Sequence, residues 1–361
     1  MTTPPPNEHR ANTALRRRRV ASTAVELTAL GFGASAIGNL YRETSPEEAA
    51  EAVAASWAAG LRYFDTAPHY GLGLSETRLG AALRGHPRES YVVSSKVGRL
   101  LVRNPAPTGL DHEGFAVPDT LRRQWDFSRD GVLRSIEGTL SRTGLDRLDV
   151  VYVHDPDEHW HQAADEAMTT LADLRDQGVV GAIGAGMNQT RMLARFLSET
   201  PADVVMLAGR YTLLDQSALD DVLPAAACLR KSVVAVGVFN SGLLSHDRPA
   251  AGLRYDYEDA PRSLVDRARR LADVCEAFGT TLPAAAIAFP FTHPAVVNVT
   301  VGMRTTAQVA RNVGLTRQAV PAGLWKALRG EGLLRADTPV PDDGDDPWTQ
   351  VGGEHLADQN R

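Results

Sequence analysis

Four polar residues in the sequence carry side chains that together could move a proton to or from an alcohol or carbonyl oxygen. Asp65 and Tyr70 lie five residues apart in the segment FDTAPHYG, and Lys96 and His154 each end a later apolar run. Residues at i and i+5 fall on different faces of a helix, and Pro68 disfavours a continuous one. The acid and the phenol are therefore expected on a loop that follows a buried strand.

This set of groups suits acid–base chemistry because each group compensates for a weakness of another. A tyrosine is a poor acid or base at neutral pH, since its ordinary pKa is about 10. A neighbouring Lys96 ammonium favours the phenolate and lowers that pKa, and Asp65 would hold Lys96 in place and keep it charged. His154 could hydrogen-bond the same substrate oxygen. None of these groups accepts a hydride, so a redox reaction would require a nicotinamide cofactor.

Strand-like and helix-like segments alternate along most of the chain. Strands are expected to end near residues 31, 64, 95, 153, 184, 207, 237 and 301, with helices between them, among them 45–60, 190–199 and 263–279. Apolar strands that alternate with helices predict parallel pairing, and eight such units favour a closed (β/α)8 TIM barrel, an α/β fold, over an open sheet. We expect one barrel domain over 17–335 that opens with a β-hairpin over 17–31, between a disordered arm (1–16) and a flexible, acidic and proline-rich tail (336–361).

The barrel gives the four polar residues a common location. Active sites of such barrels lie at the carboxyl ends of the strands. Asp65, Lys96 and His154 end the second, third and fourth strands, and the phenol lies in the loop that leaves the second. Two long connections, about 97–129 after the third strand and 241–262 after the seventh, are expected to be functional loops.

Several motifs resemble the aldo-keto reductase superfamily over about residues 18–320: LGFG…IGN, FDTAPHYG, VVSSKVGR, VYVHD and VGMRTTAQVARN. The resemblance implies a (β/α)8 barrel, NAD or NADP bound across its rim without a Rossmann domain, and a catalytic tetrad of Asp65, Tyr70, Lys96 and His154 with the tyrosine as general acid/base. The runs DFSRDGVLRSIEG, GAGMNQ and FNSGLL are similar to the D-threo-aldose 1-dehydrogenase branch, which includes L-fucose and galactose dehydrogenases. That branch oxidises the anomeric hydroxyl of a cyclic sugar to a lactone.

The resemblance also implies the cofactor-binding positions. They are Gly33, Ser35, Asp65, Met187 and Asn188; the loop Phe239, Asn240, Ser241, Gly242 and Leu243; and, towards the phosphates and adenine, Gly302, Arg304, Thr305, Gln308 and Asn312. The last group lies at the start of a helix, which suits anions. Ala208 and Gly237 stand where the family usually has a glutamine and a nicotinamide-stacking aromatic. Arg304 could bind a 2′-phosphate or only the adenine face, so NAD and NADP both remain open.

Other residues near these motifs allow more than one interpretation. Trp125 and Phe127 are candidate substrate contacts because aromatic faces pack on sugar C–H groups, but they could equally pack a lid. His69, inside the Tyr70 motif, is a third candidate. The run HDPDEHWH combines histidines with acids, but it forms a loop without the ligand spacing of a zinc site, so we predict no metal.

Composition excludes several classes of protein. The net charge of −6 and the pI of about 5.9 provide no basic surface for nucleic acid or anionic lipid. No apolar run approaches the roughly 18 residues that a membrane span requires. Cys228 and Cys275 lack CxxC partners and are expected to be reduced, buried thiols of a cytoplasmic protein.

The sequence and the resemblance together predict a cytoplasmic NAD(P)-dependent dehydrogenase that acts at C1 of an aldose, as a monomer or a homodimer. Three alternatives stay open. The same tetrad would serve a pyridoxal 4-dehydrogenase or a general aldehyde or ketone reductase, and a barrel of this kind could also be a non-catalytic sensor that only binds the cofactor.

Overall fold

Eight parallel strands form a closed barrel in this computed structural model, which describes residues 16–256 and 258–341. The strands pair in the order β10-β11-β14-β3-β4-β5-β8-β9. Their bounds are β3 (Leu30–Gly33), β4 (Tyr63–Asp65), β5 (Val92–Val97), β8 (Val150–His154), β9 (Ala182–Met187), β10 (Val204–Ala208), β11 (Ser232–Val236) and β14 (Val296–Gly302). The predicted barrel is confirmed, and each strand ends close to its predicted position.

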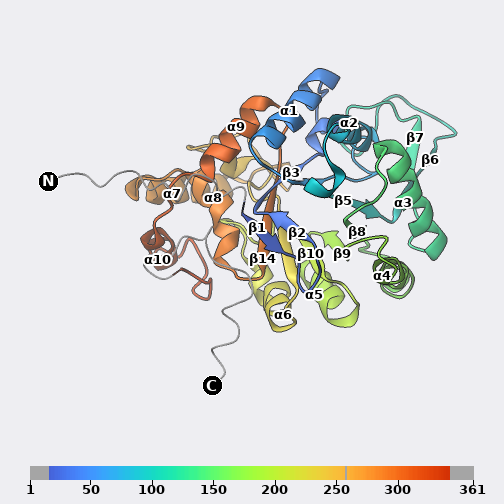
Figure 1. Ribbon diagram of the computed structural model, residues 1–361. Helices are drawn as coiled ribbons and strands as arrows, with labels where there is room; N and C mark the ends of the chain where they lie inside the picture. The colour runs from blue at the N-terminus through green and yellow to red at the C-terminus, as the bar shows by residue number, and fades with distance from the viewer. Residues whose placement is uncertain (1–15, 257, 342–361) are drawn as a thin grey trace.

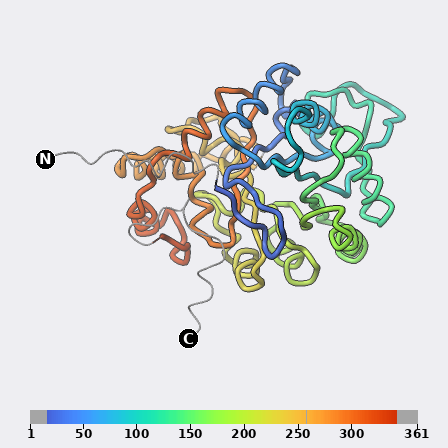
Figure 2. Tube along the Cα trace, in the orientation of Figure 1, coloured from blue at the N-terminus to red at the C-terminus, as the bar shows by residue number. Residues whose placement is uncertain are grey.

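Helices surround the barrel (Figure 1). The α-helices are α1 (Pro46–Ala58), α2 (Leu74–Leu83), α3 (Arg129–Thr143), α4 (Met168–Asp176), α5 (Thr190–Glu199), α6 (Val222–Cys228), α7 (Arg262–Ala277), α8 (Leu282–Ala288), α9 (Thr306–Leu315) and α10 (Ala322–Gly330). Figure 2 shows the chain passing around this ring in sequence order, from blue through green to orange. Each strand is thus followed by an element that covers its outer face, as parallel pairing requires.

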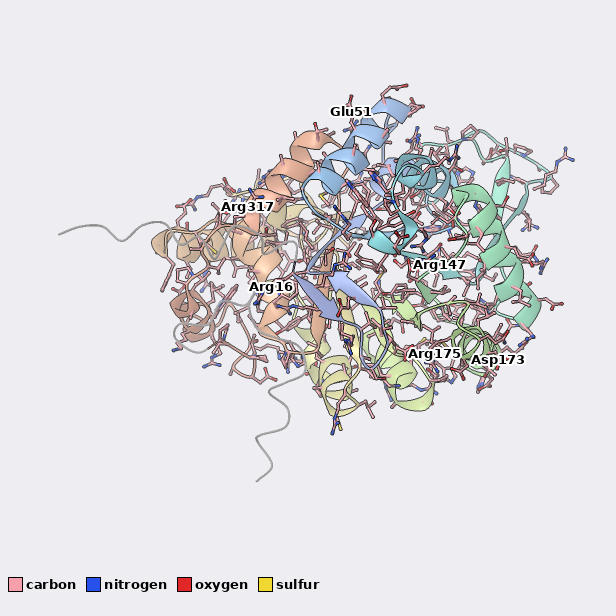
Figure 3. All side chains as sticks on the ribbon, in the orientation of Figure 1. Arg16, Glu51, Arg147, Asp173, Arg175 and Arg317 are labelled. Carbon is pink, nitrogen blue, oxygen red and sulfur yellow. The ribbon has the colours of Figure 1, made fainter. Side chains whose placement is uncertain are left out.

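Helix α1 shows why the local sequence begins a helix where it does. Ser45 Oγ accepts a hydrogen bond from the Glu48 backbone N–H at 3.0 Å, and the Glu48 carboxylate accepts one from the Ser45 N–H at 3.3 Å. This reciprocal cap satisfies donors that have no partner inside the helix. Glu51, further along α1, is exposed and lies at the outer edge of the molecule (Figure 3).

The core has two layers because side chains on a strand alternate between the barrel interior and the helices. The interior cluster contains Tyr63, Val150, Tyr152, Ala182, Val204, Met206, Val234 and Val297. Outward side chains such as Phe32, Phe64 and Val151 join the larger cluster beneath the helices. Strands buried on both faces explain the nearly continuous apolar runs in the sequence.

The predicted hairpin is present as β1 (Arg17–Arg19) and β2 (Glu26–Thr28), and it closes the amino-terminal end of the barrel. Arg18 donates to the Val296 carbonyl at 3.0 Å, and the Ala21 N–H donates to Ser232 Oγ at 2.8 Å. Val296 and Ser232 are the first residues of β14 and β11. The hairpin therefore blocks one end, and the carboxyl-terminal end is left for a site.

Both long connections carry small hairpins. The connection after β5 contains β6 (Arg99–Arg103) and β7 (Leu121–Trp125), which lie beside α3 in Figure 1. The connection after β11 contains β12 (Arg254–Tyr255) and β13 (Glu258–Asp259). In the proposed tail, Thr338 is buried. Residues 342–361, and 1–15 of the proposed arm, lie outside the described residues.

The two cysteines differ in exposure. Cys275 is buried in α7, but Cys228 is exposed at the carboxyl end of α6, so the expectation of a buried thiol is wrong for Cys228. Among the helices that the structure describes, no single one is long and apolar enough to cross a membrane. Helix α7 and the segment Leu282–Thr292 meet that test only as a pair, and they are bent by 95° at the break between them.

Candidate active site

Asp65 and Lys96 form a buried ion pair at the carboxyl end of the barrel. Lys96 Nζ lies 2.7 Å from Asp65 Oδ2 and 2.9 Å from Oδ1, and it also donates to the Thr66 carbonyl at 2.9 Å. The pair forms because β4 and β5 are neighbours with Asp65 opposite Ser94, two residues before Lys96. With side chains only 5% and 1% exposed, neither charge has water as an alternative partner.

The loop after β4 brings Tyr70 back over this pair. Lys96 Nζ lies 4.6 Å from the centre of the Tyr70 ring. The turn needs a glycine next to it, because Gly71 has φ of 63° and an added Cβ would lie 2.1 Å from the Gly38 carbonyl oxygen. The five-residue spacing of Asp65 and Tyr70 is therefore a loop geometry, as the sequence indicated.

The environment acts on Tyr70 in two opposite directions. Burial raises the pKa of Tyr70, and the positive charge of Lys96 opposes this, with a net increase. Burial lowers the pKa of Lys96, but the Asp65 carboxylate and Tyr70 raise it, and the net result favours the ammonium. The Lys96 charge thus favours the phenolate, but the expectation of a net decrease in the pKa of Tyr70 is wrong, because burial outweighs that charge. Because its pKa is raised, Tyr70 keeps its proton at neutral pH.

His154, the last residue of β8, faces the Tyr70 ring edge-on with ring centres 6.0 Å apart. Burial holds the pKa of His154 well below its usual range, and the charges of Arg99 and Lys96 add to this, so the imidazole is neutral. Nε2 lies 3.5 Å from Asp155 Oδ2, and Nδ1 is buried without a hydrogen-bond partner among the described residues. We assign the single proton to Nε2, because that nitrogen has an acceptor nearby.

Arg99 and Asp155 complete the polar rim, although the sequence analysis did not select them. The Arg99 guanidinium donates to the Asp155 carboxylate and lies 3.3 Å from His69 Nδ1. Burial, then the nearby arginines, lower the pKa of His69 to about 2, so its ring is neutral and can accept from Arg99. Sequence position could have marked both residues as part of the rim, because Asp155 directly follows His154 and Arg99 follows the strand that carries Lys96.

The connection after β5 is fastened to the Tyr70 loop. Arg123 pairs with Asp111 at 2.5 Å and donates to the His69 carbonyl at 2.8 Å. Phe115, from the same connection, packs 5.2 Å from the His69 ring and 6.1 Å from the Tyr70 ring. No local pattern in the sequence marked Arg123 and Phe115, because only the folded loop brings them to this rim.

Trp125 and Phe127 have different positions although they are stacked, with ring centres 5.7 Å apart. Trp125 is 46% exposed, whereas Phe127 is fully buried. An added Cβ on Gly98 would lie 2.1 Å from the Phe127 ring, so the phenylalanine fills its position tightly. A cavity of about 340 Å³ lies along Asp157–Gln162, whose His159 packs against both rings. The exposed ring of Trp125 can contact a ligand, and the buried ring of Phe127 packs against Trp125 from the protein interior.

The predicted cofactor residues other than Asp65 fall in four places on the rim. In the first, Gly33 pairs with Gly302 across β3 and β14, and Ser35 Oγ lies 4.0 Å from where a Cβ of Gly302 would stand. In the second, Met187 ends β9 as a buried residue, and Asn188 after it is exposed.

The third place is the loop after β11, which includes Phe239 and Leu243. Asn240, Ser241 and Gly242 have φ of 45°, 56° and 98°, an uninterrupted left-handed turn. Asn240 is 2% exposed, and its Oδ1 is buried with no hydrogen-bond partner in the described part of the chain. A buried acceptor without a donor fits a site that a polar ligand completes.

Helix α9 offers an anion-binding start near the same rim. Gln308 N–H donates to Thr305 Oγ1 at 3.2 Å, and Gln308 Oε1 accepts from the Arg304 N–H at 2.8 Å. The N–H groups of a first helical turn lack intrahelical acceptors and attract anions. The Arg304 guanidinium itself donates to the carbonyls of Leu40 and Arg42, at 2.6 and 3.0 Å. Asn312 is nearly buried, one helical turn after Gln308.

The histidine-rich run after β8 forms no cluster of metal ligands. Within residues 16–256 and 258–341, no group of three or more histidine, cysteine, aspartate or glutamate side chains could hold a metal ion.

Comparisons with known proteins identify relatives of the chain and of its fold. The model of the aldo/keto reductase family matches residues 29–328. D-threo-aldose 1-dehydrogenase of Pseudomonas sp. is 47% identical over 318 residues, which cover 87% of this chain and 97% of that protein. Pyridoxal 4-dehydrogenase of Microbacterium luteolum is 36% identical over 344 residues, 89% of this chain and 98% of that protein. An aldo-keto reductase of Bacillus halodurans in its holo form has the same fold, with a TM-score of 0.71 at 22% identity, over 90% of this chain and 98% of that structure.

Proposed function

The chain belongs to the aldo/keto reductase family and is an oxidoreductase of that family, and from this premise we propose that it oxidises the anomeric hydroxyl of an aldose to a lactone, with NAD or NADP as cofactor. The observation that carries the proposal is the buried Asp65–Lys96 pair beneath Tyr70, with neutral His154 opposite. The choice of an aldose as the substrate rests on the name of the relative that is 47% identical, D-threo-aldose 1-dehydrogenase.

The residues present fit a nicotinamide cofactor. The orphaned Asn240 Oδ1 provides an acceptor, and the start of α9 provides backbone donors for phosphates. Gly33 and Gly302 pair at the ends of the neighbouring strands β3 and β14, Ser35 follows β3, and Met187 and Asn188 lie at the end of β9. When bound, the nicotinamide would accept the hydride from C1 of the sugar.

The proton follows a short path in this proposal. Tyr70, once deprotonated, takes the proton of the anomeric hydroxyl, and the Lys96 ammonium stabilises its phenolate. Asp65 keeps Lys96 charged and fixed. His154 donates its Nε2–H to the same oxygen and so orients the sugar. In the reverse direction the protonated phenol gives its proton to the carbonyl oxygen.

The rest of the rim suits a polyol better than an apolar aldehyde. Arg99 offers donors and Asp155 an acceptor beside the tetrad, and both can hydrogen-bond hydroxyl groups. Trp125 presents an exposed ring face to the C–H side of a sugar, and His69 is a polar neighbour. This distribution favours the aldose over the general reductase alternative.

The test is a panel of L-fucose, D-arabinose, L-galactose and pyridoxal, with NAD and NADP in parallel, followed by the absorbance of the reduced cofactor. We expect oxidation of at least one aldose, with the lactone as product. Turnover of pyridoxal or simple aldehydes but of no aldose would contradict the substrate class, and cofactor binding without any turnover would indicate a sensor.

The cellular compartment and the oligomeric state of the enzyme are part of the same proposal. Two unpaired cysteines are compatible with a reducing compartment such as the cytoplasm. A monomer or a homodimer is proposed, and light scattering would measure which one forms.

A further inference from the structure

Three side chains directly beneath the tetrad carry hydroxyl groups. Because strand side chains alternate, the residue two positions before each inward-facing tetrad residue also points into the barrel. These residues are Tyr63 before Asp65, Ser94 before Lys96 and Tyr152 before His154. Tyr63, Ser94 and Tyr152 are fully buried.

The three hydroxyls form one chain that ends on Asp65. Tyr152 Oη lies 3.3 Å from Tyr63 Oη, Tyr63 Oη lies 2.9 Å from Ser94 Oγ, and Ser94 Oγ lies 2.7 Å from Asp65 Oδ1. Asp65 Oδ2 faces Lys96 at 2.7 Å. Both carboxylate oxygens thus accept from the ammonium, and Oδ1 also accepts from the hydroxyl chain.

The direction of every hydrogen bond follows from the carboxylate. An ionised carboxylate only accepts, so Ser94 must donate its single proton to Asp65. Ser94 can then bond Tyr63 only as an acceptor, so Tyr63 donates to Ser94, and by the same reasoning Tyr152 donates to Tyr63. This is the one arrangement that makes all three bonds. Burial raises the pKa of both phenols, so they keep the protons that the chain needs.

We propose that Tyr152, Tyr63 and Ser94 are positioning residues whose aligned hydroxyls hold Asp65 ionised and oriented towards Lys96. Hydrogen bonds in series polarise one another, and their effect is stronger in a dry interior than in water. The proposal deepens the proposed function and rests on it where it links Asp65, through Lys96, to the proton transfer by Tyr70.

Simple packing does not account for the chain. Phenylalanine would fill the same space at 63 and 152 without placing polar atoms in an apolar interior. Tyr211 provides the contrast and a matched control. It is also a buried phenol, but its hydroxyl pairs with Thr292 Oγ1 at 2.8 Å.

Lysine NMR tests the chain without substrate or cofactor. The sequence contains only three lysines, Lys96, Lys231 and Lys326, so a protein labelled with 13C at lysine Cε gives signals that Lys→Arg variants of the last two assign. The Lys96 signal senses the charge of Asp65, and its position is followed as the pH is lowered. The titratable groups facing Asp65 are Lys96, Tyr70, Tyr63 and Tyr152.

The pH at which the wild-type Lys96 signal changes position serves as the reference. In Ser94→Ala it should change at a pH higher by about one unit, since one hydrogen bond to the carboxylate is lost. Tyr63→Phe should cause a smaller change and Tyr152→Phe the smallest, because each lies one bond further away. Tyr211→Phe should match the wild type, and Ser94→Thr should restore its behaviour.

If Ser94→Ala does not fold, the NMR titration of the isosteric Tyr63→Phe variant tests the proposal. A Lys96 signal that is the same in Tyr63→Phe, Ser94→Ala and the wild type would overturn the proposal, as would an equal change in Tyr211→Phe. The acid limb of kcat should move in the same order. A shift in the NMR titration without aldose turnover would refute the proposed function and leave the chain standing.

Discussion

The ammonium of Lys96, which is buried, lies 4.6 Å from the centre of the ring of Tyr70, which is partly buried. The two effects of this placement oppose each other: burial favours the neutral phenol, and the lysine charge favours the phenolate. Because burial prevails, Tyr70 rests as an acid, and it must lose its proton before it can act as a base.

Tyr70→Phe should lower turnover by about 10²–10⁴-fold, because the ring stays but the group that carries the proton is lost. Cofactor binding, measured by fluorescence titration with reduced cofactor, should remain close to that of the wild type. Tyr211→Phe removes another buried hydroxyl far along the chain and should retain activity. Full activity in Tyr70→Phe would remove this residue from the mechanism.

The oxidation rate should rise with pH, and the reverse reaction should slow. The pKa of Tyr70 is raised, so the phenolate that oxidation needs is scarce at neutral pH and increases about tenfold for each pH unit below that pKa. Lys96→Met should move the rise to higher pH, because the opposing charge is lost. Initial rates in both directions across alkaline pH test this, and a flat oxidation profile would contradict it.

The free energy of unfolding should fall as the pH drops below about 6.5, the ordinary pKa of histidine. Burial lowers the pKa of His293 to about 4, so between these values the unfolded chain binds a proton that the folded chain excludes. Each such histidine contributes a loss of about 1.4 kcal/mol per pH unit. Urea unfolding at several pH values should show a shallower slope for His293→Asn than for the wild type. His161→Asn, whose side chain is 93% exposed, serves as the surface control.

Arg304→Ala should destabilise the protein by about 3 kcal/mol, because two backbone carbonyls lose a charged donor. One of them belongs to Leu40, which pairs with Phe115 beside Tyr70, so the loss should also loosen the active-site loop. Thermal or urea unfolding measures the change, with exposed Arg317→Ala (labelled in Figure 3) as control. A selective loss of NADP over NAD binding would show instead that the guanidinium contacts the 2′-phosphate.

Trp125→Ala and Phe127→Ala should separate binding from stability. Trp125 is exposed, so its loss should raise the KM for the aldose several-fold and leave stability within about 0.5 kcal/mol. Phe127 is fully buried, and its truncation should cost about 3–5 kcal/mol. Steady-state kinetics and urea unfolding of both variants check this contrast. An unchanged KM in Trp125→Ala would exclude the ring from the sugar site.

Alternation of apolar strands with helices was sufficient to predict the barrel, because parallel strands buried on both faces have a recognisable pattern. The barrel then implied that the ends of β4, β5 and β8 meet, and the structure brings Asp65, Lys96 and His154 together there. The same alternation, read two residues back, would have found Tyr63, Ser94 and Tyr152.

Other features depended on packing between distant parts of the chain. Arg304 binds carbonyls more than 260 residues away, and Phe127 is buried where Trp125 is exposed. The net direction of the Tyr70 pKa shift depends on how much water its neighbours exclude. Burial and long-range hydrogen bonds arise only when separate segments pack within a few ångströms of one another, and no local pattern of residues records that.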